Sequence, residues 1–171
     1  MGNVINELAE SGIVKGVATS VFEPDSGITN AQFLTMVLRT AGIGEKQYRG
    51  GLNDVSTEDW FAPSVQAALD YGLLGRMIVD GGFKPNERIM REDMSYLAVK
   101  AYELKKGEKA DEKEISFADS GSISAEKREY VKKAFGLNLI DGYPDGLFMP
   151  LNGASRAEAV KIIKVLTDTI K

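Results

Sequence analysis

Three copies of one pattern lie along the 171-residue chain and constrain its fold more than any other feature. Each copy has an aromatic–x–proline tripeptide and, four residues after the proline, a segment that opens a helix. The tripeptides begin at Phe22, Phe83 and Phe148, in steps of 61 and 65 residues, and the later segments begin at Ile28, Ile89 and Ala154. A unit of about 60 residues buries too little surface to be stable alone, so the three copies are expected to share one core.

Each copy begins with a segment that predicts a short amphipathic helix. Its apolar residues follow helical spacing, at Ile5, Leu8 and Ala9, at Val65, Ala68 and Leu69, and at Val131, Ala134 and Phe135. The residue that closes the helix is Gly12, Gly72 or Asn138. Glycine and then asparagine best tolerate a positive φ, so this residue is expected in the left-handed conformation.

A second helix is expected after each proline. Thr29 with Gln32 and Ser155 with Glu158 form capping-box patterns, which satisfy the first free amides of a helix. The second copy has Met90 at the capping position, where Asp93 is the residue that could serve the first turn. The apolar faces of these helices include Phe33, Met36, Val37, Ile162, Ile163 and Leu166.

The fold class that follows is mainly α, with three helix–loop–helix repeats packed around a pseudo-threefold axis. Gly142–Gly146 is typical of a tight turn rather than a strand. Two charged or glycine-rich segments, 44–51 and 105–114, are expected to be exposed connectors. The repeats are then 1–43, 52–104 and 115–171, together one structural domain.

Composition removes many function classes. The chain has no cysteine and no histidine, which excludes disulfides, thiolate or imidazole metal sites and every histidine-based catalytic triad. A net charge of −4 argues against a nucleic-acid partner. No apolar stretch reaches the ~18 to 20 residues that insertion into a membrane requires.

These residues resemble the S-layer homology family. Its repeats carry an aromatic–x–Asp opening, a tryptophan at the first helix, a Gly-Tyr-Pro-Asp-Gly-x-Phe-x-Pro loop and a Thr-Arg-Ala-Glu helix start. The third copy matches the loop at Gly142–Pro150 and the helix start at Ser155–Glu158. The second copy matches at Leu52–Asp54, Trp60 and Arg91–Asp93. The resemblance covers nearly the whole chain, and three ordered copies make it specific.

The resemblance implies a pseudo-trimeric spindle whose inter-repeat grooves hold secondary cell-wall polysaccharide. In many members the bound sugar carries a pyruvate ketal, so the ligand presents a carboxylate. The implied partners are a bacterial cell-wall polysaccharide or peptidoglycan-linked glycan, without a cofactor. The implied location is the bacterial cell surface, on an exported S-layer or other large surface protein. Ligand contacts are expected from Arg91, Arg156, Trp60, Asp54, Asp119, Asn30 and the backbone amides of Gly142 and Tyr143.

The copies depart from the family pattern in different ways. The tryptophan position of the first copy would precede Met1, so the opening of that repeat is expected to be missing, by excision or because the unit is incomplete. The third copy has Phe117–Asp119 but Ala125 or Glu126 in place of tryptophan, and the first has Asn30 in place of arginine. The grooves are therefore not expected to be equivalent.

Two residue types leave alternatives open. Arg91 and Arg156 are expected in the first turn of a helix, where the dipole disfavours a positive charge by roughly 0.3 to 1 kcal/mol. They could form an ion pair with a neighbouring repeat, for instance with Asp54 or Asp119, or forked hydrogen bonds with a ligand carboxylate and sugar oxygens. Trp60 is either a packing anchor, the commoner role of a lone aromatic at a helix start, or a platform for a sugar ring.

Neither catalysis nor a metal site is indicated. The segment Asp141–Gly146 has acids at two positions of a calcium loop, but Tyr143 and Asn152 occupy two others that need a different ligand. A glycosidase needs two carboxylates across a cleft, and nothing selects such a pair. The sequence predicts a non-catalytic cell-wall anchoring module, with a helical-repeat protein-interaction or S-layer self-assembly module as the alternative.

Overall fold

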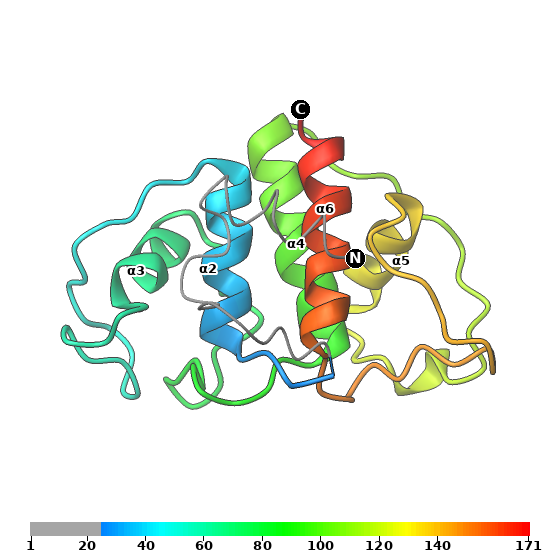
Figure 1. Cartoon of the computed structure of the whole chain (residues 1–171), viewed down its shortest axis with the longest axis horizontal. Coiled ribbons are helices and arrows are strands. Elements are labelled where there is room, and N and C mark those ends of the chain that lie inside the picture. Colours follow the sequence, from blue (N-terminus) through cyan, green and yellow to red (C-terminus); the bar gives the residue numbers. More distant parts are fainter. Residues whose placement is uncertain (1–24) are drawn as a thin grey trace.

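The computed structural model describes residues 25–171, which fold into a mainly helical body (Figure 1). Its helices are α2 (Asn30–Ala41), α3 (Ala62–Asp70), α4 (Arg91–Lys106), α5 (Arg128–Gly136) and α6 (Arg156–Thr169), with one 3-10 turn, η1 (Ser120–Ser122). In this part of the chain, extended pairing is limited to four isolated bridges. The predicted mainly-α class is confirmed. The predicted helix around Ile5–Ala9, its closure at Gly12 and the Phe22–Pro24 loop lie outside the described residues.

Three long helices form the centre of the body. α2, α4 and α6 are the second helices of the three copies, and each packs against the other two with its N-terminal end at the same end of the body (Figure 1). The shorter helices flank this bundle: α3 packs on α2, and α5 packs on α4. The first helix of one repeat thus covers the second helix of the preceding repeat.

One shared core joins the repeats, as the sequence predicted. Each central helix contributes fully buried apolar side chains to a single cluster, among them Phe33, Leu34, Leu97, Ile163 and Leu166. The loop phenylalanines Phe83 and Phe148 are also buried, at 1% and 0% exposure. Burial of one such side chain stabilises the fold by roughly 1.5 to 3 kcal/mol, so each repeat gains part of its stability from contact with the others.

A closed ring of backbone hydrogen bonds marks the pseudo-threefold axis. The Ile28 amide donates to the Ala154 carbonyl at 3.3 Å, Ile89 donates to Ile28 at 2.9 Å, and Ala154 donates to Ile89 at 2.8 Å. These three residues occupy the same position in the three copies. Each copy gives one bond to a neighbour and receives one from the other neighbour, so the arrangement closes on itself.

The first amide of each central helix extends this scheme. It donates to a loop carbonyl of another copy, from Asn30 to Glu87, from Arg91 to Asn152 and from Arg156 to Ser26, at 2.9, 3.1 and 2.9 Å. Amides in the first turn of a helix have no partner within the helix. The neighbouring repeat supplies that partner, which fixes each helix start against the next loop.

Arg88 breaks the symmetry of the ring. It stands where the other two copies have Gly27 and Gly153, and its Nε donates to the Ala154 carbonyl at 2.9 Å. A Cβ atom added at Gly27 would lie 2.6 Å from Arg88 Nε, and one added at Gly153 would lie 2.4 Å from Arg88 Cδ. The two glycines therefore make room for a single arginine side chain.

The predicted helix ends are confirmed where the structure describes them. Thr29 and Ser155 each accept a hydrogen bond from the amide three residues later, while Gln32 and Glu158 accept from the capping amides. Gly72 and Asn138 have φ of 67° and 56°, in the left-handed region. Met90 makes no side-chain cap for α4.

Asp93 lies in the first turn of α4, as expected, but its carboxylate makes no capping hydrogen bond among the described residues. Its Oδ1 lies 2.6 Å from Lys127 Nζ, at the interface between α4 and α5. Burial raises the pKa of Asp93. Burial alone would lower the pKa of Lys127, but the hydrogen bond from Lys127 to Asp93 outweighs it and the pKa is raised. This pair joins the second and third repeats.

The two connectors are exposed over much of their length, as predicted, but each has a buried residue. Tyr48 in the first connector and Ala110 in the second are each 7% exposed. The Tyr48 hydroxyl accepts from the Leu52 amide at 3.1 Å, and the Ala110 amide donates to Glu103 at 3.2 Å. Each connector is thereby fixed to the body of the domain.

Candidate functional site: the inter-repeat junctions

Asp54 and Asp119 hold the loops that precede the central helices. The Asp54 carboxylate accepts from the amides of Phe83 at 3.0 Å and Lys84 at 2.6 Å. Asp119 accepts from the two equivalent amides, those of Phe148 and Met149, at 2.8 and 2.7 Å. Among the ion pairs of residues 25–171, neither aspartate is paired with Arg91 or Arg156, so both carboxylates serve the loop amides instead.

Both loops turn through an unfavourable backbone conformation at this point. Lys84 has φ of 54° and Met149 has φ of 55°, in a region that side chains other than glycine seldom adopt. Such a residue costs of the order of 1 to 3 kcal/mol. The charged acceptor bonded to its amide offsets part of that cost, which explains the aspartates Asp54 and Asp119 at the openings of the second and third repeats.

Arg91 is buried in the junction between the second and third repeats. It is 8% exposed, and its Nε donates to the Phe148 carbonyl at 2.7 Å. Nη2 donates to the Asp141 carbonyl at 3.0 Å, and Nη1 forms an ion pair with Glu158. The guanidinium carbon also lies 4.5 Å from the centre of the Tyr143 ring. An ion pair to the neighbouring repeat does form, but its acceptor is Glu158 instead of the expected aspartates.

Glu158 has more partners than its capping role requires. Besides the Ser155 amide at 2.7 Å, it accepts from the Tyr143 hydroxyl at 2.6 Å and pairs with Arg91. Burial alone would raise the pKa of Glu158, but its hydrogen bonds and the Arg91 charge lower it. The pKa of Tyr143 is raised, first by burial and then by its bond to Glu158.

Asn30 takes the place of Arg91 in the junction between the first and second repeats. Its Nδ2 donates to the Lys84 carbonyl at 3.0 Å and more weakly to the Phe83 carbonyl at 3.4 Å. Its Oδ1 is buried without a hydrogen-bond partner. The two described junctions share one arrangement. In each, an aspartate accepts from the backbone amide of the loop phenylalanine, and the first residue of the central helix donates to the carbonyl of the same phenylalanine. The two junctions differ in charge, as the sequence predicted.

Arg156 occupies the third equivalent position and is partly buried. Its backbone amide donates to Ser26, but its guanidinium makes no hydrogen bond or ion pair within residues 25–171. The equivalent of the 141–149 loop in the first repeat lies outside the described residues. Of the two predicted ligand arginines, Arg91 thus has each of its three nitrogens bonded to a protein acceptor, whereas Arg156 has none of them so bonded within residues 25–171.

Trp60 is not a packing anchor. It is 61% exposed, and its described contact is an edge-to-face arrangement with Phe61 at a centroid distance of 5.4 Å. Phe61 is 3% exposed and anchors the start of α3 in the core. No contact joins Trp60 to Asn30 or Asp54 among the interactions of the described residues. An exposed indole beside α3 is instead available to a ligand.

Gly142 and Tyr143 belong to the loop of the third repeat. A Cβ atom added at Gly142 would lie 2.7 Å from the ring of Phe117, so glycine permits a close aromatic approach. The Tyr143 amide donates to the Leu147 carbonyl at 2.8 Å, which closes the predicted tight turn. The amide of Tyr143 is consequently already used within the loop.

The comparisons with known proteins agree with this architecture. The family model described as S-layer homology domain matches three segments, 1–34, 51–95 and 116–160. An amylopullulanase from Thermoanaerobacterium thermosulfurigenes is 36% identical over 94% of this chain, and the exoglucanase XynX from Acetivibrio thermocellus is 37% identical over 94%. The S-layer protein sap of Bacillus anthracis is 34% identical over 58% of the chain. The chain belongs to the S-layer homology domain family.

The shared region is a small part of each relative. It spans 9% of the amylopullulanase, 15% of the exoglucanase and 12% of the S-layer protein. Proteins with very different names thus have this region in common. Among residues 25–171, none of the helices combines the length and apolarity that crossing a bilayer requires.

Proposed function

We propose that the chain is a non-catalytic module that anchors an exported protein to the bacterial cell wall. The observation that carries this is the shared domain: enzymes, S-layer proteins and a "Cell surface glycoprotein 1" match in this region. The ligand is a secondary cell-wall polysaccharide, with a pyruvate ketal as its carboxylate. It binds in the grooves between repeats.

Trp60 and Arg156 are the proposed ligand contacts. The indole is 61% exposed beside α3 and can pack against a sugar ring. Arg156 supplies a guanidinium that pairs with a carboxylate in forked geometry. Arg91, Asp54 and Asp119 instead hold the junctions in shape, so they act on binding through the fold.

Sedimentation with isolated cell-wall sacculi tests this function. The domain is expected to sediment with intact sacculi and to stay in solution after acid has removed the secondary polymer. Trp60→Ala and Arg156→Ala should each weaken binding about tenfold, the effect of losing ~1.4 kcal/mol. Trp60→Phe should restore much of the first loss. Arg39→Ala removes the same charge from a partly exposed position near the C-terminal end of α2 and serves as the matched control.

Two outcomes would contradict the proposal. Undiminished binding to acid-stripped sacculi would favour a peptidoglycan target or the alternative of a protein-interaction module. Variants at Trp60 and Arg156 that bind like the Arg39 control, with unchanged circular dichroism, would remove these residues from the ligand site.

A further inference from the structure

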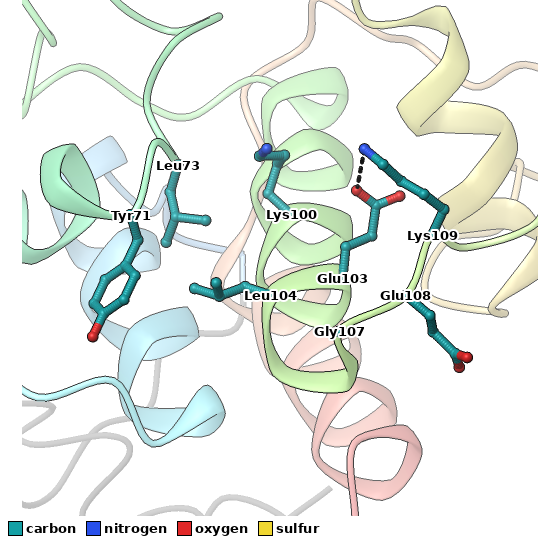
Figure 2. Close-up of a pocket in the computed structure, with 8 residues that line it drawn as sticks. All are labelled: Tyr71, Leu73, Lys100, Glu103, Leu104, Gly107, Glu108 and Lys109. Carbon is teal, nitrogen blue, oxygen red and sulfur yellow. Dashed lines mark hydrogen bonds and ion pairs between the residues drawn. The ribbon is translucent and has the colours of Figure 1, made fainter.

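A second concave surface lies away from the junctions, at the C-terminal end of α4 (Figure 2). Its volume is about 320 Å³, near the lower limit of about 300 Å³ for small-molecule sites. One wall is a helical stripe on α4, Lys100, Glu103 and Leu104, and the facing wall is Tyr71 and Leu73 after α3. The start of the second connector closes one end.

The apolar part of this pocket is unusually accessible. Tyr71 is 46% exposed and Leu104 is 39% exposed, and Leu104 points toward Tyr71 (Figure 2). The Tyr71 ring also contacts Lys46, whose Nζ lies 4.6 Å from the ring centre and 3.1 Å from Asp70. An exposed aromatic ring beside a leucine offers a flat apolar surface to an occupant of the pocket.

The charge that the pocket offers is positive. Lys100 is partly buried, and its ammonium makes no hydrogen bond or ion pair within residues 25–171. The Glu103 carboxylate is already neutralised, since it binds Lys133 at 2.9 Å and Lys109 at 3.5 Å. The Glu108 side chain extends away from Lys100 and Tyr71 (Figure 2). An occupant therefore meets one unmatched ammonium group.

We propose that this pocket binds one sugar unit of an acidic glycan, in addition to the binding at the junctions. The C–H face of the sugar packs on Tyr71 and Leu104, and its carboxylate pairs with Lys100 Nζ. Hydroxyl groups of the sugar reach the polar rim at Glu103 and Lys109. The inference rests on the proposed function, because a wall polymer would present such units, but it uses none of the junction residues.

Nuclear magnetic resonance titration of the 171-residue chain tests the inference. The probes are the disaccharide of glucuronic acid and glucose and its neutral counterpart, cellobiose. The acidic disaccharide should shift the amide signals of Tyr71, Leu73 and Leu104. Cellobiose should bind about tenfold more weakly, because it lacks the carboxylate that pairs with Lys100.

Variants separate the pocket from general charge. Lys100→Met and Tyr71→Ala should each raise the Kd for the acidic disaccharide about tenfold. Lys106→Met removes the same charge from the same helix, outside the pocket, and should leave the Kd unchanged. The amide spectrum of each variant reports directly whether the fold is kept.

Three results would overturn the inference: no shift at the pocket amides, equal affinity for cellobiose, or equal effects of Lys100→Met and Lys106→Met. Equally tight binding of an acidic dipeptide would overturn the assignment to a glycan. None of these results affects sedimentation with sacculi or its loss in Trp60→Ala, so the two proposals fail independently.

Discussion

At the scale of single residues, Arg91 shows how a positive charge is tolerated at a helix start. Its guanidinium donates to two carbonyls and pairs with Glu158, while aromatic rings cover it. Each partner comes from the third repeat. The side chain therefore stabilises the contact between repeats, and its cost at the start of α4 is offset by partners far away in sequence.

Replacing Arg91 with methionine should lower the free energy of unfolding by about 3 kcal/mol, because it leaves the partly buried Glu158 carboxylate without its counter-charge and two carbonyls without their donor. Urea unfolding measures this change. Arg156→Met, at the equivalent position in the third repeat, should cost less. Equal losses in the two variants would contradict the structural role of Arg91.

The dependence of stability on acid pH tests whether its partners stabilise the ionised form of Glu158. Its pKa in the folded chain is below the ordinary value of 4.5, so its contribution is present above that value and is lost as the pH falls through the lowered pKa. In the Glu158→Gln variant, the free energy of unfolding should therefore decrease less than in the parent as the pH falls below 4.5. An unchanged acid side would show that Glu158 is not stabilised by its partners.

At the scale of elements, local signals predicted the helices and long-range contacts escaped prediction. Capping boxes and left-handed closures depend on residues within one turn, so Thr29, Ser155, Gly72 and Asn138 could be placed from sequence. Glu158, the ion-pair partner of Arg91, is 67 residues away in sequence. Its presence was already explained by the capping box of α6, so nothing pointed to Arg91. A capping glutamate can accept more hydrogen bonds than its cap uses, but the sequence does not show that Tyr143 and Arg91 donate them.

Met90 is the capping position that lacks a hydroxyl, and it allows a stabilising change. Its φ and ψ of −78° and 153° resemble those of Thr29, −86° and 163°, so threonine fits the backbone. Met90→Thr should raise the free energy of unfolding by about 1 kcal/mol. Thr29→Ala and Ser155→Ala should lower it by a similar amount. Thermal unfolding measures the stability of the three variants relative to the parent. A Met90→Thr protein less stable than the parent would contradict the prediction.

At the scale of the whole molecule, the ring around the axis couples all three repeats. The three residues of the ring are equivalent. Of the three residues that directly precede them in sequence, only Arg88 has a large side chain. The space for that side chain comes from glycines in the two other repeats. A substitution at Gly27 or Gly153 therefore changes the packing of Arg88 in another repeat by direct contact near the axis.

A double-mutant cycle measures this coupling. Gly153→Ala should cost about 1 to 2 kcal/mol, because the added methyl group overlaps Arg88 Cδ. In the Arg88→Ala background the same change should cost less than about 0.5 kcal/mol, since the overlap is gone. Urea unfolding of the parent, both single variants and the double variant gives the cycle. Additive losses would show that the two sites are not coupled.

The closed ring also governs how many repeats such a domain holds. In an open array, each end presents an unfilled surface, so units can be added or removed one at a time. Here the ring of Ile28, Ile89 and Ala154 leaves no donor or acceptor for a fourth unit. Duplication within a gene would then enlarge the protein only in whole sets of three.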